Sequence, residues 1–390
     1  MLSDRDDSVR RMSIVPYRYK LRPGAAALTG LQGEWDRCRW VWNQAVARLN
    51  DSGEWVRDDA LTSWRREHDW LREGSVVAQQ QMLRNFRAKR AKGTGRRKFK
   101  SGKRCRPSLN YTRRGFAVKD GRLCLAGGLL IPVVWSRELP CDPSSVRVYR
   151  DSIGHWYASF VVRRDDVTLP VCHRAIGIDW GVRAVATTTE PEYDLPHSGY
   201  GKRASTELAR RQRTMARCKP ARGQPASLGY LRAKRAVAKL CKKVARQRQD
   251  AARKWARKVV ANYGIVAVED FKPQFLAKSR LARKSADGAI GATKAVLIEY
   301  AQRAGRKVVL VAPAYTTMTC SGCGARAKSR LLPSERVFGC GSCGMIEDRD
   351  RNAARVILDR AGLNPAGAEA VRHSGLLEVR VLAEPEIPFQ

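Results

Sequence analysis

The sequence is poor in acidic residues and has no long apolar run. Only 37 of its 390 residues are Asp or Glu, against 75 Lys or Arg, which leaves a formal net charge of +38. Such a basic surface favours a polyanionic partner, because Lys and Arg neutralise phosphates and release condensed counterions. No run of about eighteen apolar residues occurs, and the N-terminal MLSDRDDSVRRMS has no apolar core. We therefore expect a nucleic-acid-binding protein of the prokaryotic cytoplasm, associated with the nucleoid and without a membrane partner.

Two further absences argue against particular enzyme classes. The P-loop pattern GxxxxGK[ST] does not occur, so an NTP-driven motor is not predicted. The sequence has only five histidines, and no two of them form the His-apolar-His pair of single-strand transposases. The five are His68, His155, His173, His197 and His373.

Four of the eleven cysteines form two CxxC pairs, Cys320 with Cys323 and Cys340 with Cys343, which are separated by sixteen residues. Two such knuckles can place four thiolates at the corners of a tetrahedron, as in a structural zinc ribbon. Protein sulfur would fill every coordination position, so we expect one zinc ion that stabilises structure. A redox-active CxxC is the alternative, but it would not need two pairs. The remaining seven cysteines have no paired spacing and are interpreted as reduced thiols.

Acidic residues end two apolar segments and begin a later helix. Asp179 follows AIGI, Glu269 ends GIVAVE, and Asp350 opens DRNAARVILDRAG, while RKVVLVAP at 306–313 is a third apolar strand. Strands of one sheet can place Asp179 and Glu269 side by side, and a helix packed on that sheet can add Asp350. Gathered carboxylates are unfavourable unless cations neutralise them. Two Mg²⁺ ions roughly 3.5–4 Å apart would do so and would hydrolyse a phosphodiester. The order of these elements is that of a ribonuclease H-like α/β fold.

The N-terminal half alternates between helical and β-like patterns. Residues 14–20 resemble a strand, residues 25–50 a helix with Trp35, Trp40, Trp42 and Val46 as candidate core, and residues 110–165 a small barrel or sheet.

Basic residues concentrate in two segments. Residues 86–106 hold eleven Lys or Arg and no acid, and the helical segment 201–260 holds twenty against two acids. Such segments can be merely solvated, but uncompensated charge of this density favours a phosphate backbone as partner. The candidate phosphate-binding residues are Arg96, Arg97, Lys98, Lys100, Lys103 and Arg104 in the first segment, and Arg232, Lys234, Arg235, Lys239, Lys242 and Lys243 in the second.

Together these motifs resemble TnpB-type proteins, the transposon-encoded RuvC-like nucleases related to compact type V CRISPR effectors. GIDWG, VAVEDF and DRDRNAARVIL are similar to the first, second and third nuclease motifs of that family, and the cysteine pairs fall between the second and third. The resemblance spans nearly the whole chain. It implies a wedge-like β-barrel over 1–24 and 106–170, a helical recognition lobe over 25–105, a RuvC-like nuclease over 171–314 and 345–364, a zinc ribbon over 315–344, and a loosely ordered tail over 365–390.

The resemblance also implies an activity, which is guide-RNA-directed cleavage of double-stranded DNA beside a short DNA motif. It assigns the metal-binding role in the third motif to Asp350, with Asp348 as the second candidate. The sequence departs from the family pattern at Trp180, where smaller or aliphatic residues are commoner, and in its long tail. A type V CRISPR effector and a guide-directed repressor with little cleavage remain alternatives, although a repressor should have lost one of the three acids. The sequence does not distinguish a monomer from a homodimer.

Overall fold

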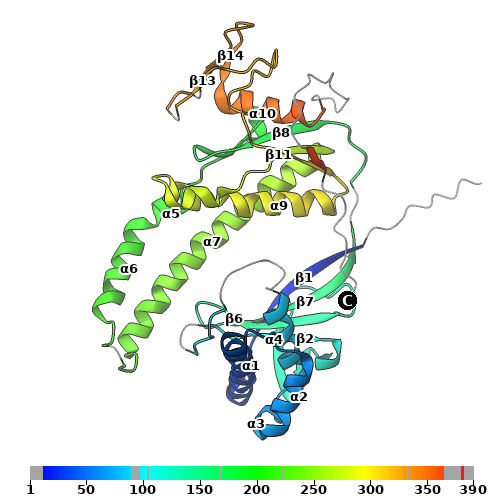
Figure 1. Cartoon of the computed structure of the whole chain (residues 1–390), viewed down its shortest axis with the longest axis vertical. Coiled ribbons are helices and arrows are strands. Elements are labelled where there is room, and N and C mark those ends of the chain that lie inside the picture. The colour runs from blue at the N-terminus through cyan, green and yellow to red at the C-terminus, as the bar shows by residue number, and fades with distance from the viewer. Residues whose placement is uncertain are drawn as a thin grey trace, which may run out of the picture. The chain divides into compact units, whose positions relative to one another are not determined.

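The computed structural model describes residues 12–88, 97–102, 105–166, 169–221, 223–329, 331–332, 334–363 and 379–381. The chain forms two compact units that divide between Asp165 and Asp166 (Figure 1). Arg96, Lys103 and Arg104 lie outside the described residues, as does most of the segment 365–390. Within the described ranges no helix has the length and apolar character needed to cross a bilayer.

The first unit is built on an antiparallel sheet of seven strands in the order β2-β6-β7-β1-β5-β4-β3. The edge strands β2 and β3 follow one another in the chain with a single 3₁₀ turn, Arg113–Gly115, between them, so the sheet is nearly closed. The strands are β1 (Met12–Leu21), β2 (Ser108–Thr112), β3 (Phe116–Lys119), β4 (Arg122–Leu125), β5 (Leu129–Val134), β6 (Ser145–Arg150) and β7 (Trp156–Asp165).

Four helices connect β1 to β2 and share a core with the inner face of the sheet. They are α1 (Ala25–Ser52), α2 (Asp58–Glu67), α3 (Asp69–Arg72) and α4 (Val76–Ala88). Trp35, Trp42 and Val46 of α1 are buried, and Trp40 is half-buried, which confirms the core that helical spacing predicts. The sheet contributes apolar residues at alternate positions, such as Tyr19 of β1, because successive side chains of a strand point to opposite faces.

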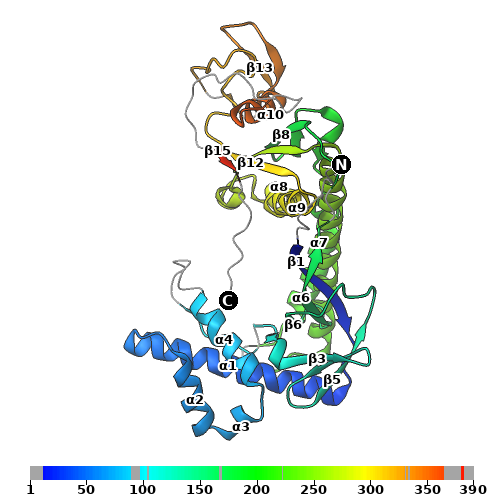
Figure 2. The same ribbon diagram turned by 90° about the vertical axis from the view of Figure 1, so that its right-hand side faces the viewer.

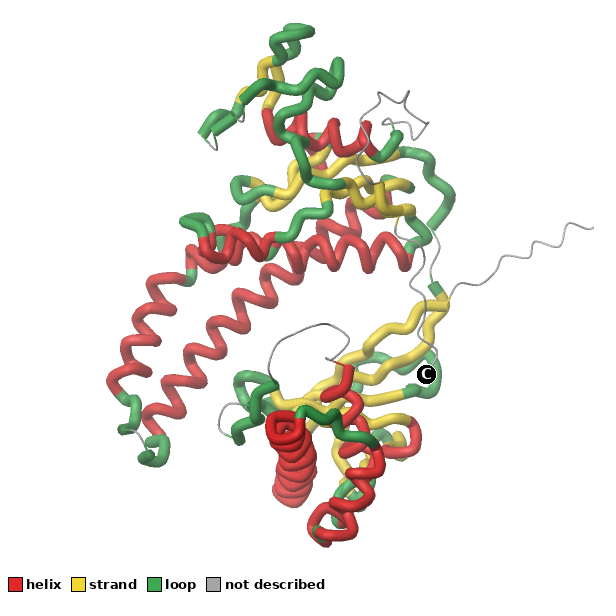
Figure 3. Tube along the Cα trace, viewed as in Figure 1, coloured by secondary structure: helices red, strands yellow, loops and turns green. Residues whose placement is uncertain are grey.

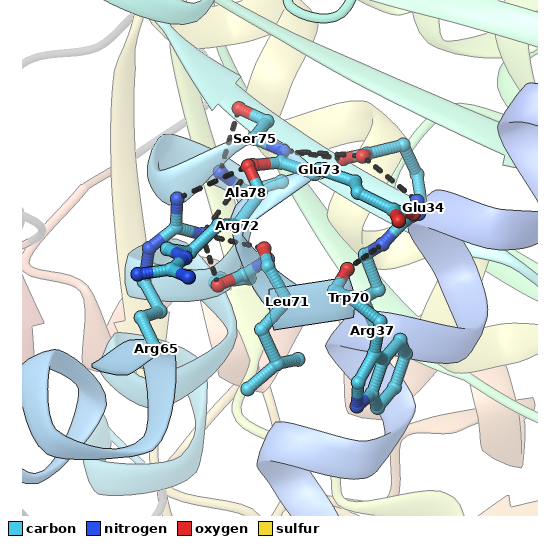
Figure 4. A network of polar contacts seen from close by, with 11 residues as sticks. Glu34, Arg37, Arg65, Trp70, Leu71, Arg72, Glu73, Ser75 and Ala78 are labelled. Atoms are coloured by element: carbon cyan, nitrogen blue, oxygen red, sulfur yellow. Dashed lines mark hydrogen bonds and ion pairs between the residues drawn. The ribbon is translucent and has the colours of Figure 1, made fainter. Parts of the chain in front are cut away.

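A buried polar network holds the turn between α3 and α4 against α1 (Figure 4). Both carboxylate oxygens of Glu34 accept from the backbone N–H of Ser75, at 3.1 and 3.2 Å. Arg65 donates to the carbonyl oxygen of Leu71 and to the side-chain oxygen of Gln79, each at 2.7 Å. Burial raises the pKa of Glu34. Every partner in this network is a group within the unit, so the network serves to fix the helical segment.

The second unit contains a mixed sheet of six strands in the order β10-β9-β8-β11-β12-β15. Strands β8, β11 and β12 are parallel, and β9 and β15 pair antiparallel to β8 and β12. The strands are β8 (Ala175–Trp180), β9 (Ala184–Thr188), β10 (Leu195–Pro196), β11 (Ile265–Glu269), β12 (Lys307–Val311) and β15 (Val379–Val381). Strand β15 comes from the segment 365–390, for which the sequence predicts only a loosely ordered tail.

Helices cover both faces of this sheet (Figures 1 and 2). Helices α7 and α9 share a core with one face, to which β8 contributes Ile176 and Ile178, while α10 packs on the other face. Helix α10 approaches β8 so closely that a Cβ at Gly177 would clash with the carbonyl oxygen of Ala354. The helices are α5 (Tyr200–Arg203), α6 (Ser205–Arg217), α7 (Leu228–Asn262), α8 (Ala282–Gly288), α9 (Ile290–Arg303) and α10 (Arg349–Arg360).

Helices α6 and α7 form an antiparallel hairpin, which is red in Figure 3. With 35 residues, α7 is about 50 Å long at 1.5 Å per residue. Its C-terminal half packs against the sheet through Trp255 and Val259, whereas its N-terminal half carries mostly exposed side chains. The side chain of Ser227 caps the helix by accepting from the N–H of Tyr230. The segment 201–260, which the sequence predicts to be helical, therefore forms this hairpin together with the short helix α5.

Candidate active site and metal centre

Two of the three predicted acids stand at the carboxyl ends of neighbouring parallel strands. Asp179 and Glu269 each come one residue after Ile178 and Val268, which are the last positions paired between β8 and β11. The neighbours Ile178 and Val268 face the α7 and α9 core. Because side chains alternate along a strand, both acids face the opposite side, where α10 lies.

The third predicted acid comes from the first turn of α10. Asp348 caps that helix, since its Oδ1 accepts from the N–H groups of Asp350 and Arg351 at 3.0 and 3.1 Å. Asp350, inside the first turn, points into the same space as the two strand acids. Of the two acids that compete in the third motif, the structure thus gives the capping position to Asp348 and the inward position to Asp350.

Asp179, Glu269 and Asp350 line one cavity of about 830 Å³. The ends of β8, β11 and β12 form its floor, and the ribbon adds Leu331 and Arg336. The cavity is large enough for a segment of a polymeric substrate. Its lining also includes the basic residues Arg183, Lys272, Arg336 and Arg349.

Burial and mutual repulsion define the electrostatics of this floor. The side chains of Asp179 and Glu269 are only 6% and 5% exposed. Burial, and then the charges of Glu269 and Asp350, hold the pKa of Asp179 well above its usual range. Burial raises the pKa of Glu269 to about 7, although its Oε1 accepts from the hydroxyl of Thr316 at 3.4 Å. Anionic forms of both groups therefore need a cation nearby.

Two arginines hold the third acid, and sequence reasoning missed both. Arg336 lies against Oδ2 of Asp350 and Arg349 against Oδ1, each at 3.1 Å. Arg336 belongs to the loop between the cysteine pairs, where nothing in the local pattern indicates a role. Only the fold brings the ribbon over the ends of the strands, so the sequence carried no signal for this pair.

The four cysteines form a compact group of possible metal ligands. Their sulfur atoms all lie within 4.8 Å of one another, with 3.6 Å between Cys320 and Cys343 and between Cys323 and Cys340. A tetrahedron with Zn–S bonds of about 2.3 Å has edges of about 3.8 Å, so the sulfur positions fit zinc. Backbone N–H groups of Cys343 and Ser342 lower the pKa of Cys340 to about 6, which favours the thiolate, whereas the pKa of Cys320 is raised by burial and that of Cys323 is raised by the neighbouring thiols. Among the described residues the three carboxylates are not gathered so closely.

The cysteine group and the acidic site are linked through one buried amide. Asn352 of α10 is fully buried, two residues after Asp350. Its Oδ1 accepts from the N–H of Ser321 at 2.9 Å, and its Nδ2 donates to the carbonyl oxygen of Thr319 at 2.7 Å. Thr319 and Ser321 flank Cys320 of the four-cysteine group. The first knuckle is therefore fastened to the helix that carries Asp350. The ribbon hairpin, β13 (Val337–Gly339) and β14 (Ile346–Asp348), leads directly into the same helix.

The described residues among the predicted phosphate-binding residues separate into exposed and packed groups. In the first segment Lys98 is exposed, whereas Arg97 is 8% exposed and lies over Trp55, and the ammonium of Lys100 lies 4.0 Å from the ring centre of Trp42. The structure thus gives Arg97 and Lys100 packing roles. On α7 four exposed residues recur at three- or four-residue spacing along one face, namely Arg232, Arg235, Lys239 and Lys243. Lys234 is exposed on another face, and Lys242 is half-buried.

Two curated proteins are similar to this chain over most of its length. A "Putative RNA-guided DNA endonuclease" of Streptomyces pristinaespiralis is 31% identical over 369 residues, which are 89% of this chain and 89% of that protein. The "Putative RNA-guided DNA endonuclease InsQ" of Escherichia coli K12 is 28% identical over 383 residues, covering 88% of this chain and 91% of that protein.

Two family models and a solved structure match as well. Residues 159–280 match the OrfB_IS605 model, described as "Probable transposase", and residues 291–357 match the Cas12f1-like TNB domain. Asp179 and Glu269 fall in the first match, and Asp350 and the four cysteines in the second. The Cas12f1–sgRNA–target DNA complex contains a chain with the same fold at a TM-score of 0.53 and 14% identity, covering 85% of this chain and 82% of that chain.

Proposed function

Because this chain belongs to the TnpB-type family of transposon-encoded proteins, we propose that it is a guide-RNA-directed DNA endonuclease with a RuvC-like active site. Its second unit is then the ribonuclease H-like nuclease with an inserted zinc ribbon, and its first unit is the wedge with a helical recognition lobe. Guide RNA would pair with one strand of the target DNA beside a short motif. The names of the relatives support this activity.

One observation carries the proposal, which is that Asp179, Glu269 and Asp350 line a single cavity although 170 residues lie between the first and the last. Carboxylate oxygens are the ligands that Mg²⁺ prefers. The donor set therefore fits two Mg²⁺ ions held by these acids. When bound there, the ions supply activation of water and stabilisation of the leaving oxygen.

The chain's own residues then orient the substrate and the ligands. Asp179 and Glu269 are fixed by the strand ends, and the hydroxyl of Thr316 orients Oε1 of Glu269. Arg336 and Arg349 hold Asp350, and they place positive charge where a phosphodiester would lie. A guanidinium suits a phosphate oxygen as well as a carboxylate. The zinc ribbon, held by its four thiolates, positions Arg336 over the site.

The proposal is tested by loading the protein with a guide RNA of chosen sequence. RNA that copurifies with the protein when it is expressed with its flanking locus would be sequenced, and the guide segment would be replaced by a chosen sequence. Mg²⁺-dependent cleavage of a plasmid that carries the matching target is expected. The proposal fails if the loaded protein binds that target but never cuts it under any divalent metal condition.

Asn352→Ala is expected to lower the rate of target cleavage about 10- to 100-fold, as the loss of a group that orients metal ligands typically does. The substitution leaves the N–H of Ser321 and the carbonyl of Thr319 without their side-chain partner. Zinc content should stay at one per chain, because no ligand is removed. Single-turnover cleavage and metal analysis of the same preparation provide the measurement. An unchanged cleavage rate would mean that the link between knuckle and α10 is not needed for positioning.

The exposed face of α7 should bind nucleic acid through phosphates alone. Replacing Arg232, Arg235, Lys239 and Lys243 together by Ala is expected to weaken guide RNA binding. The slope of log affinity against log salt should flatten by about 0.7 to 0.9 for each phosphate that is no longer neutralised. Sequence preference should not change, because phosphates carry no sequence information.

The exposed Arg66 of α2 offers a control for this face, and Arg66→Ala should leave the salt slope unchanged. An unaltered slope in the quadruple variant would show that the α7 face is only solvated.

A further inference from the structure

An arginine joins the first turn of α10 to the end of β9. Arg351 directly follows Asp350, and its Nη1 and Nη2 donate to Oδ1 and Oδ2 of Asp194 at 3.0 and 2.8 Å, which makes a bidentate pair. Nη1 also donates to the carbonyl oxygen of Thr188, the last residue of β9. The side chains of Arg351 and Asp194 are only 16% and 29% exposed. Solvent therefore screens this pair less than it screens a surface ion pair.

Thr188 completes a closed set of hydrogen bonds with the same two side chains. Its backbone N–H donates to Oδ1 of Asp194 at 2.8 Å, and its hydroxyl donates to that oxygen at 3.3 Å. Asp194 thus binds the strand end and the helix at once. In the register of β8 and β9, Thr188 lies opposite Ile178, the residue before Asp179. A short bonded path therefore runs from the first turn of α10 to Asp179.

The turn that carries Asp194 is itself held by α7. The indole Nε1 of Trp255 donates to the carbonyl oxygen of Tyr193 at 2.7 Å, and the ammonium of Lys258 donates to that of Glu192, also at 2.7 Å. The side chain of Tyr193 is buried. Asp194 therefore extends from a turn that α7 anchors at the two preceding residues.

The bidentate pair restrains α10 on a side that Asn352 does not reach. Successive residues of a helix point about 100° apart, so Arg351 faces β9 while Asn352 faces the first knuckle. Asn352 alone would leave the first turn free to rotate about one contact. Two contacts in different directions fix that turn, which also contains Asp350. General stabilisation would account for an ion pair anywhere on α10, but not for its place one residue after an acid of the cavity.

We propose that Arg351 and Asp194 are positioning residues that hold Asp350 in place relative to Asp179. The inference rests on the proposed function, because the divalent cations belong to it. Neither residue is among the described residues that line the cavity, so their effect passes through Asp350. Ligands of a working site must be held within about 0.5 Å of the productive geometry. A bidentate guanidinium–carboxylate pair supplies the direction that this needs.

The test measures metal binding and cleavage by the full-length protein. Arg351→Gln and Asp194→Asn keep the approximate size of each side chain and remove its charge. Each should weaken Mn²⁺ binding, measured by electron paramagnetic resonance without guide or target, about 10- to 100-fold. Single-turnover cleavage at limiting metal should fall by a similar factor. Arg351→Lys should remain impaired, because an ammonium cannot reproduce the planar fork of a guanidinium. The Asp350→Asn variant identifies the Mn²⁺ that is bound at the acidic site.

A double variant and a matched ion pair serve as controls. Asp194→Asn combined with Arg351→Gln should lose little more than either single variant, because both changes break the same contact. Arg303→Gln breaks an ion pair with Glu299 within α9 and should bind Mn²⁺ like the parent. Because the variants of Arg351 and Asp194 also lose a half-buried ion pair, Mn²⁺ is titrated at a temperature at which thermal melting shows every variant to be folded.

Three results would each overturn the proposal. They are parent-like Mn²⁺ binding by folded Arg351→Gln and Asp194→Asn, losses that simply add in the double variant, and Mn²⁺ binding by the parent that Asp350→Asn leaves unchanged. The Mn²⁺ titration needs neither guide nor target. It therefore tests the positioning role even if the parent does not cut DNA, so a failure of the proposed activity is distinguishable from a failure of this inference.

Discussion

Asp179→Asn, Glu269→Gln and Asp350→Asn are each expected to lower the rate of target cleavage at least about 10³-fold while guide and target binding persist. Each change removes one anionic metal ligand and keeps the shape of the side chain. Metal ions stabilise the transition state by several kcal/mol, and about 1.4 kcal/mol corresponds to a tenfold change in rate. Single-turnover cleavage of a labelled target and a gel-shift assay on the same samples measure the two effects.

Asp348→Asn is the matched control for that series. It alters the acid that competes with Asp350 in the third motif, and Asn retains the capping of α10 because an amide oxygen also accepts from backbone N–H groups. Cleavage should stay within a few-fold of the parent. Strong loss in Asp348→Asn together with full activity in Asp350→Asn would reverse the assignment of these two acids.

Asp179→Asn and Glu269→Gln should preserve or raise folding stability although they lower the rate of cleavage. The pKa values of Asp179 and Glu269 are raised in the folded state, so ionising these groups costs stability as the pH rises above about 4, and for Glu269 this loss extends to about pH 7. Without Mg²⁺ at about pH 8, the neutral amides of Asp179→Asn and Glu269→Gln should therefore leave Tm unchanged or raise it. A lowered Tm would attribute the lost cleavage to misfolding.

Cys320→Ser and Cys340→Ser are expected to abolish tight zinc binding and, with it, cleavage. Structural zinc contributes about 10–16 kcal/mol in isolated zinc-finger peptides, which equals or exceeds the stability of an ordinary domain. The ribbon has few other means of stability, because among its described residues the apolar cluster consists of Phe338 and a few partly buried neighbours beside the cysteines. Metal analysis and limited proteolysis of the ribbon measure the two effects.

Cys241→Ser is the control for the cysteine series, since Cys241 is an exposed thiol on α7 outside the four-cysteine group. Zinc content, proteolysis and cleavage should all match the parent. Clean parent protein that contains no zinc, or Cys320→Ser that retains it at full occupancy, would contradict the assignment.

Local sequence patterns were sufficient to predict a feature wherever its residues lie close together in the sequence or recur with a simple period. The two CxxC pairs indicate a metal group because each pair spans only four residues. The positions of Asp179 and Glu269 at strand ends could be predicted because each residue ends an apolar run that is short enough to be a buried strand. Trp35 and Trp42 of α1 could be predicted as core residues because helical spacing places them on one face of the helix.

The charge pattern of the sequence, by contrast, did not predict which basic side chains are exposed. The run 86–106 predicts solvent-facing cations, but Arg97 and Lys100 lie over Trp55 and Trp42 within the helical core. Aliphatic stems and cation–π interactions allow such residues to pack, and no local pattern distinguishes them from exposed neighbours such as Lys98. Composition thus predicted the class of partner, but not which cations face it.

By itself the sequence determined the resemblance to the family, and it indicated the candidate acids Asp179, Glu269 and Asp350 and the two cysteine pairs, because motif spacing and side-chain periodicity are local properties of the chain. Only the tertiary structure decided that Arg336 and Arg349 hold Asp350 and that Asn352 joins the first knuckle to α10. These arrangements depend on strand register and on helix packing between distant segments. A shift of one residue in β8 would turn Asp179 toward the core under α7 and α9, and no short stretch of sequence specifies that register.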